Sequence, residues 1–145
     1  MGEKIVPTIA VILLNEESVL LIRHGENAKQ QTGVYSLPGG VVESGETHVQ
    51  AAVRELLEET SLQANPADLI EIPKFYSARI VRKNETKVYS MKAFFCQRWV
   101  GKKVKGVAGE TYPEWVKIAD LNSIPLLPNI LDAVGEAQRL FKHAA

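Results

Sequence analysis

The stretch from Gly39 to Leu62, which reads GGVVESGETHVQAAVRELLEETSL, gathers the side chains that could do chemistry. Three of its carboxylates, Glu55, Glu58 and Glu59, follow one another at helical spacings. Like charges one turn apart on a helix repel each other unless a cation neutralises them. Because carboxylate oxygens are hard ligands, we expect a divalent ion, Mg²⁺ or Mn²⁺, rather than zinc. The alternative is a solvated acidic helix face without a chemical role.

These acidic side chains need a helix that presents them together. Thr47 can cap its N-terminus, and Gln50 three residues later can reach back to Thr47, as in a capping box. The helix should then run from about His48 to Thr60. At 100° per residue the three glutamates gather on one side. The opposite, core-facing side should consist of Val49, Val53, Leu56, Leu57 and Thr60.

The order of the residues carries more information than their charges. Counted along the chain, the pattern is Gly40, five residues, Glu46, seven residues, Arg54-Glu55-Leu56, one residue, Glu58-Glu59, one residue, Ser61-Leu62. This pattern resembles the Nudix box, which differs only in having Gly where this chain has Ser61. The preceding Leu37-Pro38-Gly39-Gly40 also looks like the family's lead-in to the box.

The resemblance implies an α+β protein with the Nudix fold, a mixed β-sheet in an α/β/α sandwich. It also implies metal-dependent hydrolysis of a nucleoside diphosphate linked to another group, by attack of water on phosphorus. Carboxylate-bound divalent ions suit that reaction because they neutralise phosphate oxygens and lower the pKa of a bound water. At the matching positions the implied metal ligands are the carbonyl of Gly39 and the carboxylates of Glu46, Glu55, Glu58 and Glu59. Arg54 would orient the carboxylates.

The general base stays open, because members of the family use either a glutamate of the box or one on a later loop. Glu55 is the candidate within the box. Glu110 precedes Glu114-Trp115, at a place where MutT-like members carry a glutamate. An exposed loop acid without a role is the alternative for Glu110.

Two residues outside the box are candidates for binding substrate. Leu126-Leu127-Pro128-Asn129 resembles a region of MutT-like enzymes in which asparagine reads a purine edge, and an amide can offer such an edge both a donor and an acceptor. Asn129 could instead cap the helix that follows Pro128. Arg23 ends a predicted strand and is a candidate contact for phosphate or ribose, or else a solvated cation.

Composition sets bounds on the class of protein. A chain of 145 residues suggests one domain, 1–145, with a buried core. The formal net charge of +0 offers no global basic surface for long nucleic acid, so the nucleotide partner should be a small molecule. The single cysteine, Cys96, lies in an apolar run and excludes a disulfide framework. The longest N-terminal apolar stretch, 9–14, is too short to span a membrane, and we expect a cytoplasmic protein.

Hydrophobic patterning places strands on both sides of the acidic helix. Strands are predicted at 5–14, 18–23, 34–37, 41–42, 69–82, 87–100 and 114–118, and a second helix begins at Pro128. The first two strands should form a hairpin, and 69–82 with 87–100 should form the longest one. One helix in the middle of such a series and one at its end favour a mixed sheet between helices.

Two classes of function fit this chain, an enzyme and a non-catalytic module that senses a nucleotide or RNA. All acids of the box are present, which favours the enzyme. Within that class, Asn129 and Glu110 favour hydrolysis of a (d)NTP to (d)NMP and pyrophosphate, with ADP-ribose or a dinucleoside polyphosphate as the alternative substrate. Homodimers are common in the family, so a second copy of the chain is a candidate partner.

Overall fold

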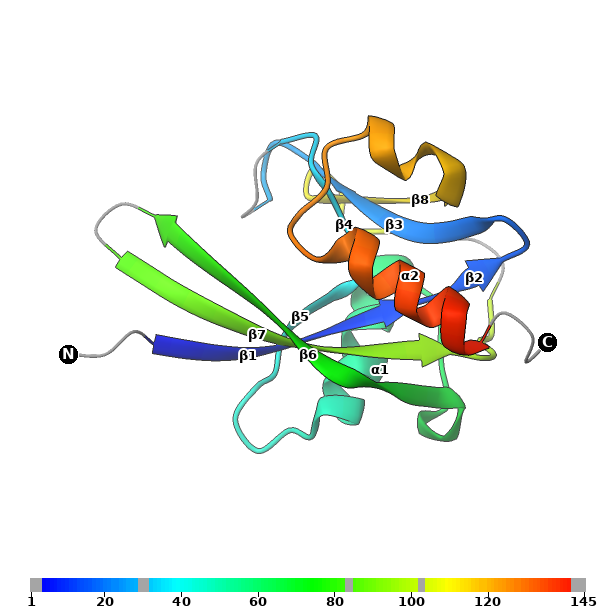
Figure 1. Cartoon of the computed structure of the whole chain (residues 1–145), viewed down its shortest axis with the longest axis horizontal. Coiled ribbons are helices and arrows are strands. Elements are labelled where there is room, and N and C mark those ends of the chain that lie inside the picture. Colours follow the sequence, from blue (N-terminus) through cyan, green and yellow to red (C-terminus); the bar gives the residue numbers. More distant parts are fainter. Residues whose placement is uncertain (1–3, 29–31, 83–84, 102–103, 142–145) are drawn as a thin grey trace.

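The computed structural model describes residues 4–28, 32–82, 85–101 and 104–141, and its elements are shown in Figure 1. In chain order they are β1 Lys4–Ile12, β2 Leu14–Asn15, β3 Ser18–His24, β4 Tyr35–Ser36, β5 Gly39–Val41, α1 His48–Thr60, η1 Pro66–Asp68, β6 Leu69–Arg82, β7 Glu85–Cys96, β8 Thr111–Lys117, η2 Ile118–Ser123 and α2 Ile130–Phe141. Here η denotes a short 3₁₀ helix. Part of the predicted turn between β6 and β7, residues 83–84, lies outside the described residues.

The first sheet is mixed and has the order β5-β1-β7-β6. Its central strand β1 runs parallel to β7, from the pair Lys4 and Lys87 to the pair Ile12 and Phe95, and antiparallel to β5. The predicted hairpin of 5–14 with 18–23 is therefore wrong, since only the two-residue strand β2 pairs with β3. The physical reason is that β1 is apolar on both faces, which suits a strand covered on both sides better than a hairpin arm.

The second sheet forms around β3, which pairs antiparallel with β2 and β4 and, along its whole length, with β8. Strand β8 begins at Thr111, earlier than predicted, and contains Pro113. Proline lacks the N–H of a ladder bond, and it is tolerated here because β8 pairs with β3 alone among the described strands.

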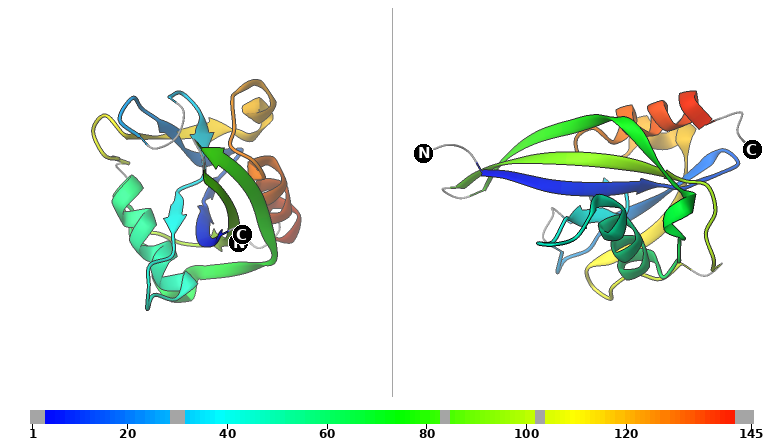
Figure 2. Two further views of the ribbon diagram at one scale, coloured as in Figure 1. Left: turned by 90° about the vertical axis from the view of Figure 1, so that its left-hand side faces the viewer. Right: turned by 90° about the horizontal axis from the view of Figure 1, so that it is seen from below.

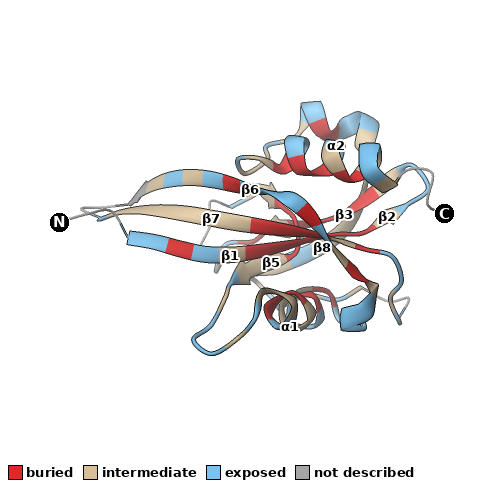
Figure 3. Ribbon diagram, turned by 60° about the horizontal axis from the view of Figure 1, so that its bottom comes forward, coloured by how far each residue is buried: buried red, intermediate tan, exposed pale blue. Residues whose placement is uncertain are grey.

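The two helices cover opposite faces of the sheets, as Figure 3 shows. Alternate residues of β1 divide between them, because successive side chains of a strand point to opposite faces. Ile9 and Val11 pack in the cluster that contains Ala51 and Leu56 of α1. The cluster under α2 contains Ala10, Ile12, Ala133, Val134 and Ala137. The predicted α/β/α sandwich is confirmed.

Strand β7 ends at Cys96 rather than at Val100. Its partner β6 begins at Leu69, directly opposite Cys96, so the ladder has no further residues to continue with. The Cys96 thiol is buried and donates to the carbonyl of Arg98 at 3.1 Å, which agrees with the predicted core position. Burial raises the pKa of this thiol to about 11.

The strands β1, β6 and β7 extend beyond the helices toward the N-terminal end of β1, as the right-hand view of Figure 2 shows. Between their inner part and the second sheet lies the cleft described below. None of the described helices is both long enough and apolar enough to cross a membrane.

Candidate active site

Helix α1 has the predicted bounds and the predicted capping box. Thr47 Oγ1 accepts from the backbone N–H of Gln50 at 3.1 Å, and Gln50 Oε1 accepts from the N–H of Thr47 at 2.9 Å. The orientation of the helix differs from the expectation at one position, because Leu57 is 44% exposed. The buried side chains are those of Ala51, Ala52, Leu56 and Thr60. The small side chains of Ala51 and Ala52 let this side of the helix lie close to the sheet. The glutamates then lie near β5, the edge strand of that sheet.

Glu59 lies between the helix and the Gly39-Gly40 turn. Its Oε1 accepts from the backbone N–H of Gly39 at 2.7 Å. Burial raises the pKa of this carboxyl to about 8, although the bond from Gly39 acts in the opposite direction. Glu59 is thus a poorly solvated acid for which a nearby cation would be favourable.

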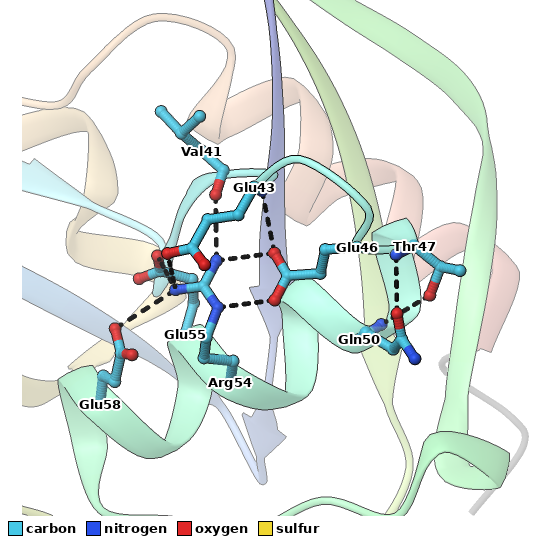
Figure 4. Close-up of polar contacts among 8 residues, drawn as sticks. All are labelled: Val41, Glu43, Glu46, Thr47, Gln50, Arg54, Glu55 and Glu58. Carbon is cyan, nitrogen blue, oxygen red and sulfur yellow. Dashed lines mark hydrogen bonds and ion pairs between the residues drawn. The ribbon is translucent and has the colours of Figure 1, made fainter.

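Arg54 joins the other acids of the box, as Figure 4 shows. Its Nε and Nη2 donate to the two oxygens of Glu46 at 2.7 and 2.8 Å, and its Nη1 donates to Glu55 at 2.8 Å and to Glu58 at 3.4 Å. These bonds lower the pKa of Glu46 to about 2, together with a bond from the N–H of Glu43. Burial raises the pKa of Glu55 in spite of Arg54. One guanidinium therefore hydrogen-bonds three carboxylates of the box, and it forms an ion pair with Glu43 at 3.7 Å.

Glycine is required at Gly39 because backbone atoms of β1 approach it closely, and a side chain on Gly40 would displace the Glu55 carboxylate. A Cβ on Gly40 would lie 2.6 Å from a carboxylate oxygen of Glu55, and a Cβ on Gly39 would lie 2.1 Å from the carbonyl oxygen of Ile9. The turn thus packs between the central strand β1 and the acids of α1. It fixes where Glu55 and Glu59 sit.

The donor set suits a hard divalent cation, although the described residues contain no group of three ligands already converged on one point. Glu46, Glu55 and Glu58 instead bond Arg54, and Glu59 bonds the Gly39 N–H. All these donors are carboxylate oxygens on one helix and its preceding loop, the type that Mg²⁺ and Mn²⁺ prefer.

Two predicted residues lie away from this cluster. Glu110 is exposed in the turn before β8, and no hydrogen bond or ion pair joins its carboxylate to the glutamates of the box. That turn is held to the loop after β3, where Gly25 N–H donates to the Glu110 carbonyl at 2.8 Å. Arg23 bonds Glu114 through Nε at 3.0 Å and stacks on the ring of Tyr112 at 4.6 Å. Neither side chain lines the cleft beside the box.

That cleft is bounded by Gly39 and Gly40 on one side and by the start of α2 on the other. Asn129, the predicted substrate-binding residue, lines it and donates through Nδ2 to the carbonyl of Ser77 in β6 at 3.0 Å. Among the described residues, no hydrogen bond from the first turn of α2 to Asn129 Oδ1 is found, so its side chain does not cap the helix. Its backbone has a left-handed φ of 73°, which is why α2 begins at Ile130 rather than at Pro128.

The cleft wall also contains polar groups that the sequence did not single out as site residues. His24 Nε2 and Ser36 Oγ are 2.8 Å apart, and both residues are buried. Burial lowers the pKa of His24, which keeps the imidazole neutral. Tyr76 also lines the cleft. These residues come from three strands, so no spacing along the chain signals that they meet.

The NUDIX domain family matches the chain over residues 4–136. The chain belongs to the Nudix family of hydrolases. Its fold agrees, because the MutT Nudix hydrolase of Burkholderia pseudomallei superposes with a TM-score of 0.76, at 17% identity, over 92% of this chain and 98% of that one. The Nudix domain of NrtR from Shewanella oneidensis, whose crystals contained ADP ribose, superposes with a TM-score of 0.69, at 16% identity, over 97% and 90%.

Two relatives show what this Nudix chain resembles in sequence. The ADP-ribose pyrophosphatase of Methanocaldococcus jannaschii is 32% identical over 83% of this chain and 66% of its own length. The NAD-capped RNA hydrolase NudC of Edwardsiella ictaluri is 42% identical over 60 residues, which are 41% of this chain and 22% of that protein. The chain therefore spans less than two thirds of either relative.

Ser61, the departure from the box, has the left-handed backbone expected for the family's Gly, with φ 68° and ψ 10°. Its Oγ also donates to the carbonyl of Lys105 at 2.8 Å, a bond that the sequence did not suggest. We expect Ser61→Gly to stay within about 1 kcal/mol of the wild type in unfolding free energy, because relief of roughly 1 kcal/mol of strain offsets the lost bond. Activity should persist, since the hydroxyl has no chemical role.

Urea unfolding of Ser61→Gly beside Ser61→Ala tests this balance. The alanine variant loses the same bond but keeps the strained backbone, so it should be less stable than the glycine variant by about 1 kcal/mol. Equal stability of the two variants would show that the left-handed backbone carries no cost at this position.

Proposed function

We propose that this Nudix chain is a metal-dependent pyrophosphohydrolase that converts a purine (d)NTP to (d)NMP and pyrophosphate. The observation that carries the proposal is that Gly39 and Gly40 connect the cleft with the acidic helix. Both residues line the cleft, and they lie against Glu59 and Glu55 respectively. A nucleotide with its base in the cleft would thus have its phosphates beside the acids of α1.

The metal ligands in this proposal are the carboxylates of Glu55, Glu58 and Glu59, with Glu46 and the Gly39 carbonyl as further donors. Bound Mg²⁺ or Mn²⁺ would neutralise phosphate oxygens and lower the pKa of the attacking water. The buried position of Glu59 supports this assignment, because a carboxylate with little solvent gains most from a cation. Arg54 keeps the remaining carboxylates on one side of the helix until metal and substrate bind.

Glu55 is our proposed general base. Its carboxylate lies against Gly40, which lines the cleft next to where the phosphates of the substrate would lie. Glu110 is exposed and has no contact with the acids of the box. The test is to compare Glu55→Gln with Glu110→Gln, and a loss of kcat confined to Glu110→Gln would reverse the assignment.

Asn129 supports a purine nucleotide. The bond from its Nδ2 to Ser77 fixes the plane of the amide and uses one N–H. The second N–H and Oδ1 remain as a donor and an acceptor, a pair that matches the edge of a purine. ADP-ribose is the second candidate, because the archaeal relative is named for its hydrolysis and the NrtR domain was crystallised with it.

A nucleotide panel assayed with Mg²⁺ and with Mn²⁺ tests the proposal. Release of pyrophosphate from dGTP, dATP, GTP or ATP is expected, with the monophosphate as the other product. Release of AMP and ribose 5-phosphate from ADP-ribose at higher kcat/KM would favour the second candidate. Absence of metal-dependent hydrolysis across the panel would contradict both candidates and favour a sensing module.

Replacing Asn129 with alanine tests purine recognition. We expect Asn129→Ala to raise KM for the preferred purine nucleotide by roughly tenfold and to leave pyrimidine nucleotides nearly unchanged, because hydrogen bonds to a bound base are worth about 1 to 3 kcal/mol. A melt beside the kinetics separates this effect from loss of the Ser77 bond. Equal losses of kcat/KM for every base would reject the recognition role.

A further inference from the structure

The described part of the chain has a buried side-chain polar atom without a hydrogen-bond partner, and the residue that carries it lines the cleft. The atom is the hydroxyl oxygen of Tyr76, a residue that is 2% exposed. A buried hydroxyl in this state has lost its bonds to water and gained none in exchange. Such a group is destabilising unless something that is present during function bonds to it.

The charged groups nearest to Tyr76 are already paired. Lys74 Nζ lies 4.9 Å from the ring centroid but bonds Asp132 at 2.8 Å, and Glu136 bonds Arg139 at 2.9 Å. Burial, and after it the charges of Asp132 and Glu136, raise the pKa of Tyr76 to about 12. The hydroxyl therefore keeps its proton at neutral pH and is available as a donor.

The structure also places Tyr76 next to Asn129. Ser77, whose carbonyl accepts from Asn129, follows Tyr76 directly in β6. Ile130, which follows Asn129, packs in the same apolar cluster as Tyr76. Asn129 and Tyr76 thus belong to one wall of the cleft, formed by β6 and the start of α2.

We propose that Tyr76 is a specificity-determining residue whose hydroxyl hydrogen-bonds the base of a purine nucleotide held by Asn129. A purine presents N7 on a second edge beside its Watson–Crick edge, so an amide can bond two atoms of one edge while a hydroxyl bonds an atom of the other; a pyrimidine has no such ring nitrogen on a second edge. This inference rests on the proposed function and adds to it the group that completes base recognition.

Tyr76→Phe removes the hydroxyl and keeps the ring. For the preferred purine nucleotide we expect KM to rise about tenfold while kcat stays within about twofold, because the lost bond is made to bound substrate before and during the reaction. The Tm of the metal-free and nucleotide-free variant should stay level or rise, because an unpaired buried hydroxyl has been removed.

Tyr35→Phe is the matched control. The Tyr35 hydroxyl donates to Glu114 at 3.1 Å, and Tyr35 does not line the cleft. We expect this variant to lose Tm and to keep KM, the reverse of the result for Tyr76→Phe. Comparing KM and Tm for the same Tyr→Phe substitution at the two positions thus distinguishes a hydrogen bond to substrate from a hydrogen bond within the protein.

Either of two results for Tyr76→Phe would overturn the inference. An unchanged KM would show that the hydroxyl does not touch the base, and a lower Tm would show that it has a partner, such as a water, in the free protein. Calorimetry can measure the binding of GMP and AMP to the wild type and to Tyr76→Phe. This measurement tests base recognition without requiring that the protein hydrolyse a nucleotide. Weaker binding to the variant supports it even if no nucleotide is hydrolysed, and equal binding, or none to wild type, counts against it.

Discussion

Glu59→Gln should abolish turnover and raise the Tm of the metal-free protein. The amide is nearly the same size and can keep the bond from the Gly39 N–H, but it removes a carboxylate that burial makes costly to ionise. Loss of one charge from the proposed metal ligands should lower kcat by roughly 10²-fold or more. Melts in EDTA above pH 8, where Glu59 is ionised in the wild type, show the gain in Tm at its largest.

Glu58→Gln is the informative companion. Its side chain is 55% exposed and pairs with Arg54, so we expect the same loss of kcat but little change in Tm. The structure thus predicts a gain of stability for Glu59→Gln but not for Glu58→Gln, although the positions of the two residues in the sequence suggest equal gains for both variants. Full activity of either variant at saturating Mg²⁺ would contradict the proposed metal site.

Arg54→Lys should lower kcat by about 10²-fold although it keeps the charge. Arg54 bonds both oxygens of Glu46 and also reaches Glu55, Glu58 and the Val41 carbonyl, a geometry that a guanidinium fork allows and an ammonium does not. Displacement of catalytic groups by about 1 Å is enough for a loss of this size. The variant should also require a higher concentration of Mg²⁺ for half-maximal activity.

Arg139→Lys provides the control for the same substitution away from the site. Arg139 pairs with Glu136 on the exposed side of α2, and an exposed ion pair of this kind contributes little. Its kinetic constants and its Mg²⁺ requirement should match those of the wild type. If Arg54→Lys matched the wild type as well, Arg54 would be no more than a surface cation.

The sequence alone determined the family, the acidic helix and most strands of this protein. These features are local, since a capping box spans four residues and the box is a fixed spacing along one helix and its preceding loop. Strand β6 was predicted with its observed bounds, because the alternation of apolar residues is written in neighbouring residues. The left-handed backbone of Ser61 agrees with the family's Gly at this position of the box.

Only the tertiary structure decided which strands pair and which polar groups meet. After β1 the chain passes from one sheet to the other, and this depends on which elements cover the two faces of β1. Those elements are distant in the sequence, so no short segment predicts the change of sheet. The cleft has the same origin, because Tyr76, Asn129, His24 and Ser36 are brought together from separate elements. Likewise, the burial of Glu59 and the exposure of Leu57 follow from how closely α1 approaches the Gly39-Gly40 turn, a distance set by packing rather than by helical periodicity.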